Sequence, residues 1–208
     1  MELHQILRSL SEKRRLFHSE ADFQFALAWE VKSFHPACEI RLEIPVKTDQ
    51  DEQKKRIDIV VRDAKKIFPI ELKYLKKTLH GAFGGETYDL ATGVHDMDMH
   101  DCLKDIARLE ALRERLAGFC AGYAVWLTND NAYWNADYNA SYYKEFHAPD
   151  GTEKSGMLRF SGDTYITGQK GYKSPVVLQE KYRILWRDYS DLDIKNGVFK
   201  YAVITVEK

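Results

Sequence analysis

Two acidic residues and one lysine carry the most specific chemical signal in this sequence. Asp58, Glu71 and Lys73 lie in the stretch 56–77, which reads as two short strands joined by a polar turn at 63–66. Apolar residues alternate along both halves, as expected of strands that bury one face. Two carboxylates on neighbouring strands favour a shared hard cation such as Mg²⁺, because hard ions prefer oxygen ligands.

The same alternation predicts how the two strands pair. A hairpin built on a type I turn at 63–66 sets Asp58 directly opposite Glu71, with Cβ atoms roughly 4.5–5.5 Å apart. Lys73 points to the same face as Glu71 because side chains alternate along a strand. A slip of one residue would expose the apolar face, so the pattern fixes the register. That face comprises Ile57, Ile59, Val61, Phe68, Ile70, Leu72 and Tyr74.

A helix predicted over residues 19–34 supplies a third carboxylate. Ser19 is a suitable N-cap, and Glu20 falls near the centre of the apolar face, one turn before Phe23. Acids also favour helix N-termini, so Glu20 is either a site residue or a first-turn acid that interacts with the helix dipole. Glu30 lies at the edge of the apolar face and is the weaker site candidate.

Asp58 followed by Glu71-Leu72-Lys73, after a helix that carries Glu20, resembles the PD-(D/E)xK, or restriction-endonuclease-like, nuclease superfamily. The resemblance implies that Asp58, Glu71 and the backbone carbonyl of Leu72 bind the metal directly. It implies that Glu20 acts on the metal site, through water, and that Lys73 lies beside the attacking water. The implied cofactor is Mg²⁺, with Mn²⁺ able to substitute.

The resemblance implies an α/β fold with a restriction-endonuclease-like core. That core runs helix, three-stranded meander, helix, strand, and forms a mixed central sheet flanked by helices over about 19–130. The residues themselves predict a strand at 39–46, a helix at 101–116 and a parallel crossover to a strand at 123–127. We expect one domain over 1–208, with a C-terminal β-rich elaboration from about 131 that includes strands at 157–161, 182–187 and 198–206.

Residues 76–100 are rich in glycine and are predicted to form a long loop that borders the substrate. The loop and its exit hold a group of histidines and aspartates whose spacing fits no zinc site, and Asp98 or Asp101 is expected to cap the next helix. The basic residues nearest the predicted site are candidate substrate contacts: Lys76, Lys77, Lys104 and Arg108.

Composition sets limits on the class of protein. The chain has 208 residues, a formal net charge of −1 and three cysteines without metal-ligand spacing. An odd number of cysteines and the lack of a membrane-length apolar stretch predict a cytoplasmic protein without a membrane partner. The near-neutral charge gives no global attraction to nucleic acid, so we expect a homodimer or a partner protein to add DNA contacts.

These observations predict a metal-dependent phosphodiesterase: a Mg²⁺-dependent nuclease acting on nucleic acid, in the first instance a DNA endonuclease. The alternative is a non-cleaving nucleic-acid-binding or scaffold subunit on the same fold. A third reading is an interaction protein in which the carboxylate pair is incidental. Stabilisation by metal would argue against this third reading, because a ligand that binds only the folded state raises its stability.

Overall fold

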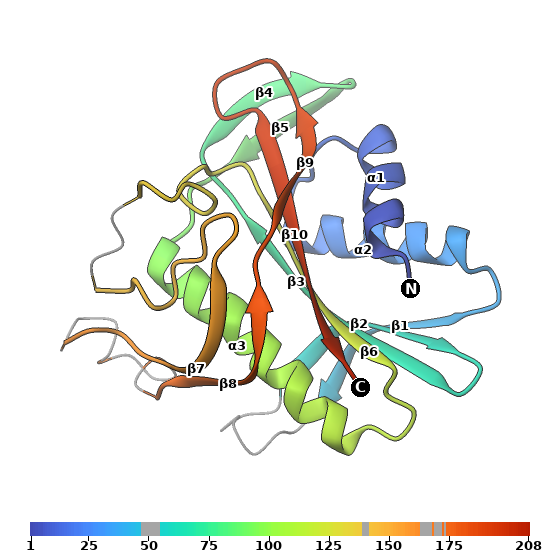
Figure 1. The fold of residues 1–208 in the computed structure, drawn as a ribbon. Coiled ribbons are helices and arrows are strands. Elements are labelled where there is room, and N and C mark those ends of the chain that lie inside the picture. Colours follow the sequence, from blue (N-terminus) through green and yellow to red (C-terminus); the bar gives the residue numbers. More distant parts are fainter. Residues whose placement is uncertain (47–54, 139–141, 163–167, 169–171, 173) are drawn as a thin grey trace.

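The computed structural model describes residues 1–46, 55–138, 142–162, 168, 172 and 174–208. Its centre is a six-stranded mixed sheet in the order β1-β2-β3-β6-β10-β9, accompanied by two hairpins, β4–β5 and β7–β8 (Figure 1). The helices are α1 (Leu3–Lys13), α2 (Glu20–Phe34) and α3 (His95–Arg115). The strands are β1 (Glu39–Val46), β2 (Lys55–Asp63), β3 (Lys66–Leu75), β4 (Leu79–Phe83), β5 (Glu86–Leu90), β6 (Ala121–Thr128), β7 (Glu153–Leu158), β8 (Val176–Arg183), β9 (Trp186–Asp191) and β10 (Val198–Glu207).

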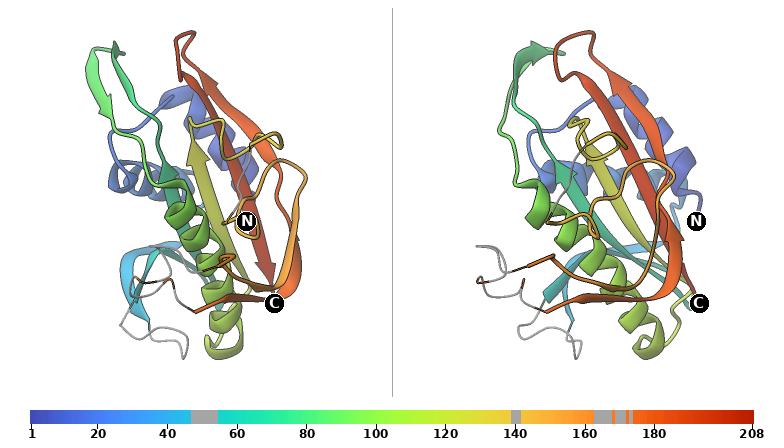
Figure 2. Two further views of the ribbon diagram at one scale, coloured as in Figure 1. Left: turned by 90° about the vertical axis from the view of Figure 1, so that its left-hand side faces the viewer. Right: turned by 60° about the vertical axis from the view of Figure 1, so that its left-hand side comes forward.

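Helices cover both faces of the sheet (Figures 1 and 2). α1 and α2 bury one apolar cluster against it, and α3 with the β7–β8 hairpin buries a second cluster on the opposite face. Burying apolar surface on both faces is what a helix–sheet–helix arrangement requires. The predicted α/β class, with a mixed central sheet flanked by helices, is confirmed.

The chain passes through α2, β1, β2, β3, α3 and β6 in that order, with the β4–β5 hairpin inserted before α3. α3 makes the crossover between β3 and β6, which pair in parallel as predicted. β1 pairs with β2 over the expected range. The last third of the chain adds β10 and β9 to the same sheet, beside β6.

The predicted register of the β2–β3 hairpin is confirmed from Ile59–Ile70 to Asp63–Lys66. The predicted turn type is wrong. Ala64 has a φ of +52°, whereas a type I turn has negative φ at both central positions. Two-residue hairpin loops favour turns with positive φ because their twist matches that of the strands.

β2 is irregular at Asp58, and this moves Ile57. The β1–β2 ladder has no Glu43–Asp58 pair, and Glu43 has a φ of +56°. The side chain of Gln24 on α2 donates instead to the Asp58 carbonyl, at 2.7 Å. Past this point the alternation reverses, so Ile57 packs on the α3 side of the sheet rather than with Ile59. The expected single apolar face is therefore wrong at Ile57.

Residues 76–100 are not a long loop. They contain the β4–β5 hairpin, whose turn uses Gly84 and Gly85 at positive φ, followed by the first turns of α3. α3 begins at His95, and its N-cap, Val94, makes no side-chain capping bond. The expectation that Asp98 or Asp101 caps the helix is wrong, since both lie inside it.

The C-terminal strands were predicted in part. The segment 198–206 is confirmed as β10. The strand predicted at 157–161 begins four residues after the start of β7 and ends three residues after its end. The prediction of a strand at 182–187 is wrong, because the chain leaves β8 after Arg183 and starts β9 at Trp186. In the described part of the chain, no helix is long and apolar enough to cross a membrane.

Candidate active site

Two carboxylates bind the edge of β3 where β2 separates from it. The β2–β3 ladder ends at Ile59–Ile70, so the predicted direct pairing of Asp58 with Glu71 is not part of it. Instead the backbone N–H of Leu72 donates to Asp58 Oδ2 at 2.6 Å. The N–H of Tyr74, two residues on, donates to Glu20 Oε2 at 2.8 Å. Side chains from β2 and α2 thus satisfy backbone groups that a regular strand would pair.

A small polar cavity of about 170 Å³ lies beside this edge, between β3 and α3. It brings together Asp58, Glu71 and Lys73, as the sequence predicted. Five more charged residues complete its lining: Arg56, Asp101, Lys104, Asp105 and Arg108. Lys104 and Arg108, two of the candidate substrate contacts, therefore belong to the same cavity as the acids.

Glu71 is 2% exposed, and its partner is Arg108. The Arg108 guanidinium donates to Glu71 Oε1 and lies 2.9 Å from Asp105 Oδ1. Arg108 is itself buried, because the face of α3 that carries it packs toward β3. Arg108, a candidate substrate contact, therefore lies between the buried acids Glu71 and Asp105 rather than on an open surface.

Lys73 is held by α3 as well as by its own strand. Its ammonium lies 2.8 Å from Asp105 Oδ2 and donates to the Leu72 carbonyl at 3.0 Å. Burial alone would lower the pKa of Lys73, but the Asp105 and Glu20 carboxylates outweigh it and hold that pKa well above its ordinary value. These two carboxylates therefore favour the ammonium form of Lys73.

The pKa values of the two strand acids are raised as well, which in their case favours the neutral form. Burial raises the pKa of Asp58 to about 6, against the opposing effects of the Leu72 N–H and Lys73. Burial, followed by the neighbouring Asp105 charge, raises the pKa of Glu71 well above its usual range. Desolvated carboxylates placed close together are stabilised by a shared cation.

The donor atoms have the chemistry of a hard-cation site. Asp58, Glu71 and the Leu72 carbonyl offer only oxygen, which suits Mg²⁺ or Mn²⁺. Within the described residues, no group of three or more His, Cys, Asp or Glu side chains is arranged to hold a metal. At Glu71, Arg108 occupies a carboxylate oxygen that a metal could use.

Glu30 and two of the lysines proposed as substrate contacts make their contacts elsewhere. Lys77 pairs with the buried Asp130 at 3.0 Å, and the Lys76 ammonium lies over the ring of Tyr74. Glu30, the weaker helix candidate, accepts from Ser9 and Lys13, both at 2.6 Å.

The sequence interpretation missed Arg56, Asp101 and Asp105 as lining residues. Asp101, Asp105 and Arg108 are spaced at i, i+4 and i+7, so they share one face of α3. A charged stripe on a helix whose apolar positions are also periodic was the signal available.

Neither a protein-family model, nor a curated protein, nor a solved structure matches this chain.

Proposed function

We propose that the chain is a metal-dependent phosphodiesterase: a nuclease that uses Asp58, Glu71 and Lys73, with Glu20 beside them. The observation that carries this proposal is the convergence of the three strand residues on one cavity at the point where β2 leaves β3. The order α2, β1, β2, β3, α3, β6 supports it, because it matches the core order of the restriction-endonuclease-like fold. We assign those elements to that core.

Asp58, Glu71 and the Leu72 carbonyl would hold the Mg²⁺ or Mn²⁺, which supplies an activated water and a Lewis acid for the phosphoryl oxygen. For Glu71 to bind the metal through Oε1, that oxygen would exchange Arg108 for the metal. In the reaction water adds to phosphorus and one P–O ester bond breaks, which leaves a phosphate monoester and an alcohol.

The protein's own cations act on the phosphate. The Asp105 and Glu20 carboxylates raise the pKa of Lys73, which favours a role in stabilising negative charge and orienting the water over a role as a base. Arg108, once released from Glu71, presents a planar guanidinium suited to phosphate oxygens. Asp105 forms ion pairs with both cations and so positions them.

The testing experiment incubates supercoiled plasmid, linear duplex and single strands of DNA with the protein and Mg²⁺ or Mn²⁺. Asp58→Asn and Lys73→Ala, purified separately, and reactions with EDTA are the controls. We expect cutting that needs metal and is lost in both variants. Absence of cutting, together with no change in melting temperature on adding metal, would refute the assignment.

One observation favours the alternative of a non-cleaving nucleic-acid-binding or scaffold subunit. A binding module on this fold needs a cationic partner for its buried acids, and Arg108 provides one for Glu71. That alternative predicts that metal leaves the melting temperature unchanged while DNA or a partner protein still binds. A homodimer, if present, would appear in the same preparations by light scattering.

A further inference from the structure

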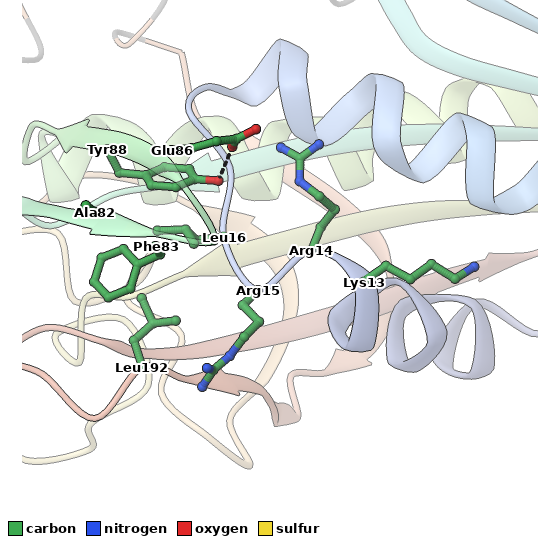
Figure 3. Close-up of a pocket in the computed structure, with 10 residues that line it drawn as sticks. Lys13, Arg14, Arg15, Leu16, Ala82, Phe83, Glu86, Tyr88 and Leu192 are labelled. Atoms are coloured by element: carbon green, nitrogen blue, oxygen red, sulfur yellow. Dashed lines mark hydrogen bonds between the residues drawn. The ribbon is translucent and has the colours of Figure 1, made fainter.

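A second and larger cavity lies away from the acidic site. It measures about 440 Å³ and opens between the segment joining α1 to α2, the β4–β5 hairpin and Leu192 after β9 (Figure 3). Three consecutive cations line the side formed by the end of α1 and the segment after it: Lys13, Arg14 and Arg15. Phe83 and Tyr88 line the hairpin side.

The three cations differ in what they bind. Lys13 pairs with Glu30 and Arg14 with Asp22, at 2.6 and 2.7 Å. In Figure 3, Lys13 extends away from Phe83, whereas the Arg15 side chain lies on the side of Phe83 and Leu192. Among the residues that the structure describes, no acid pairs with the Arg15 guanidinium. Arg15 is thus the cation that this pocket has available for a ligand.

The backbone that carries Arg15 is fixed by β9. Tyr189 donates its hydroxyl proton to the Arg14 carbonyl at 2.8 Å, and the Ser190 hydroxyl donates to the Arg15 carbonyl. A guanidinium on a fixed backbone loses less conformational entropy when it binds than one on a mobile loop.

An aromatic surface faces the cation. The Phe83 ring is half-buried and tilts against Tyr88, with 6.2 Å between ring centroids. The ring lies over Gly81, where an added Cβ would come within 2.8 Å of it. Tyr88 in turn stacks on His18, with centroids 4.1 Å apart, which ties the hairpin to the α1–α2 segment.

We propose that this pocket holds one unpaired nucleotide of the substrate strand, with its base on Phe83 and its phosphate on Arg15. The proposal rests on the proposed nuclease function and names the part of the substrate that lies beyond the cutting site. An aromatic face next to a cation is the arrangement by which proteins hold single-stranded nucleic acid. An acidic peptide would use the guanidinium and leave the ring without a partner.

The pocket is close enough to the acidic site for one strand to reach both. Arg15 precedes Glu20 by five positions, so their Cα atoms are at most about 18 Å apart. Glu20 binds the β3 edge that also binds Asp58. A short oligonucleotide can therefore place a phosphodiester at Asp58 and an unpaired nucleotide on Phe83.

The experiment measures fluorescence anisotropy of a labelled oligothymidylate of about 12 nucleotides in EDTA, where no cutting occurs. Arg15→Gln and Phe83→Ala are compared with matched substitutions outside the pocket, Arg62→Gln and the exposed Trp29→Ala. We expect about tenfold weaker binding for Phe83→Ala. For Arg15→Gln we expect weaker binding and a salt slope smaller by about 0.7, the loss of one phosphate contact.

Each outcome has a separate meaning for the pocket and for the nuclease. If neither Arg15→Gln nor Phe83→Ala weakens oligonucleotide binding, the pocket proposal is overturned. This holds even if the parent cuts DNA and Asp58→Asn does not. Binding that falls in both, with no cutting under any metal, supports the pocket and refutes the nuclease. Thymidine monophosphate that binds as tightly as the oligonucleotide would overturn the strand assignment in favour of a free nucleotide. An oligoglutamate peptide that competes equally would overturn it in favour of an acidic peptide.

Discussion

The guanidinium of Arg108 donates to the carboxylate of Glu71 in a part of the protein where both side chains are buried. The pair is an ion pair inside the cavity that also holds Asp58 and Lys73. The guanidinium compensates the charge of the buried acid, and it competes with a metal for the Glu71 Oε1 atom.

This relationship predicts an unusual response of Arg108→Gln to metal. Removing one partner of a buried ion pair costs about 3–5 kcal/mol, so the variant should melt well below the parent in EDTA. In the variant no guanidinium competes with the metal for Glu71. Mg²⁺ should therefore raise the melting temperature of the variant more than that of the parent. Thermal melts over a range of Mg²⁺ concentrations measure both effects.

Arg113→Gln is the matched control for Arg108, since Arg113 lies on the same helix and pairs with Glu180 outside the cavity. Its melting temperature should respond to Mg²⁺ as the parent's does. A response of Arg108→Gln no larger than the parent's would mean that Arg108 and the metal do not compete for Glu71.

Asp105→Asn tests whether Asp105 keeps Lys73 protonated. Loss of the neighbouring negative charge lowers the pKa of Lys73, so cleavage should decline at a lower pH on the alkaline side than in the parent. The maximal rate should fall about 10–100-fold, because the lysine also loses its position. The rate is measured against pH, with Glu114→Gln, on the exposed side of α3, as control. An unchanged alkaline limb would argue against this role.

Two glutamates of α2 give a matched comparison. Glu20→Gln keeps an oxygen that can accept from the Tyr74 N–H, so its melting temperature should stay near the parent's while cleavage falls about 10–100-fold. Glu30→Gln should lower the melting temperature and leave cleavage near the parent's rate, because it weakens the contacts to Lys13 and Ser9 far from the cavity. Plasmid cleavage and melting curves of the two variants decide the point. Full cleavage activity in Glu20→Gln would mean that Glu20 has no part in catalysis and only binds the edge of β3 from the start of α2.

Asp130 gives a prediction about stability in acid. Burial alone would raise its pKa, but contacts with His95, the Ala132 N–H and Lys77 lower it to about 2. An acid whose pKa is lower in the folded state stabilises the protein above its unfolded pKa of about 4. That stabilisation is lost as pH falls from about 4 to 2. Asp130→Asn should therefore be less stable than the parent at pH 7, with a gap that narrows in this range.

Urea unfolding at several pH values measures that gap, and Asp137→Asn, at an exposed position, is the control. A gap that stays constant between pH 4 and 2 would show that the contacts of Asp130 do not depend on its charge.

The sequence alone determined the chemistry-bearing strands and the register of their ladder from Ile59–Ile70 to Asp63–Lys66. Strict alternation with a two-residue period leaves one pairing that buries the apolar residues, so the β2–β3 ladder followed from it. The same logic predicted α2, its Ser19 cap and the parallel crossover to β6. These features depend on contacts between neighbours in the chain or on one local pattern.

Only the tertiary structure decided how the acids are partnered. Asp58 binds the Leu72 N–H because Gln24, from another element, takes the backbone carbonyl of Asp58 and β2 bends away. Arg108 reaches Glu71 because α3 packs beside β3 with its Asp101, Asp105 and Arg108 face toward the cavity. Such contacts join residues far apart in the chain, and their energies depend on burial, which the order of residue types does not specify.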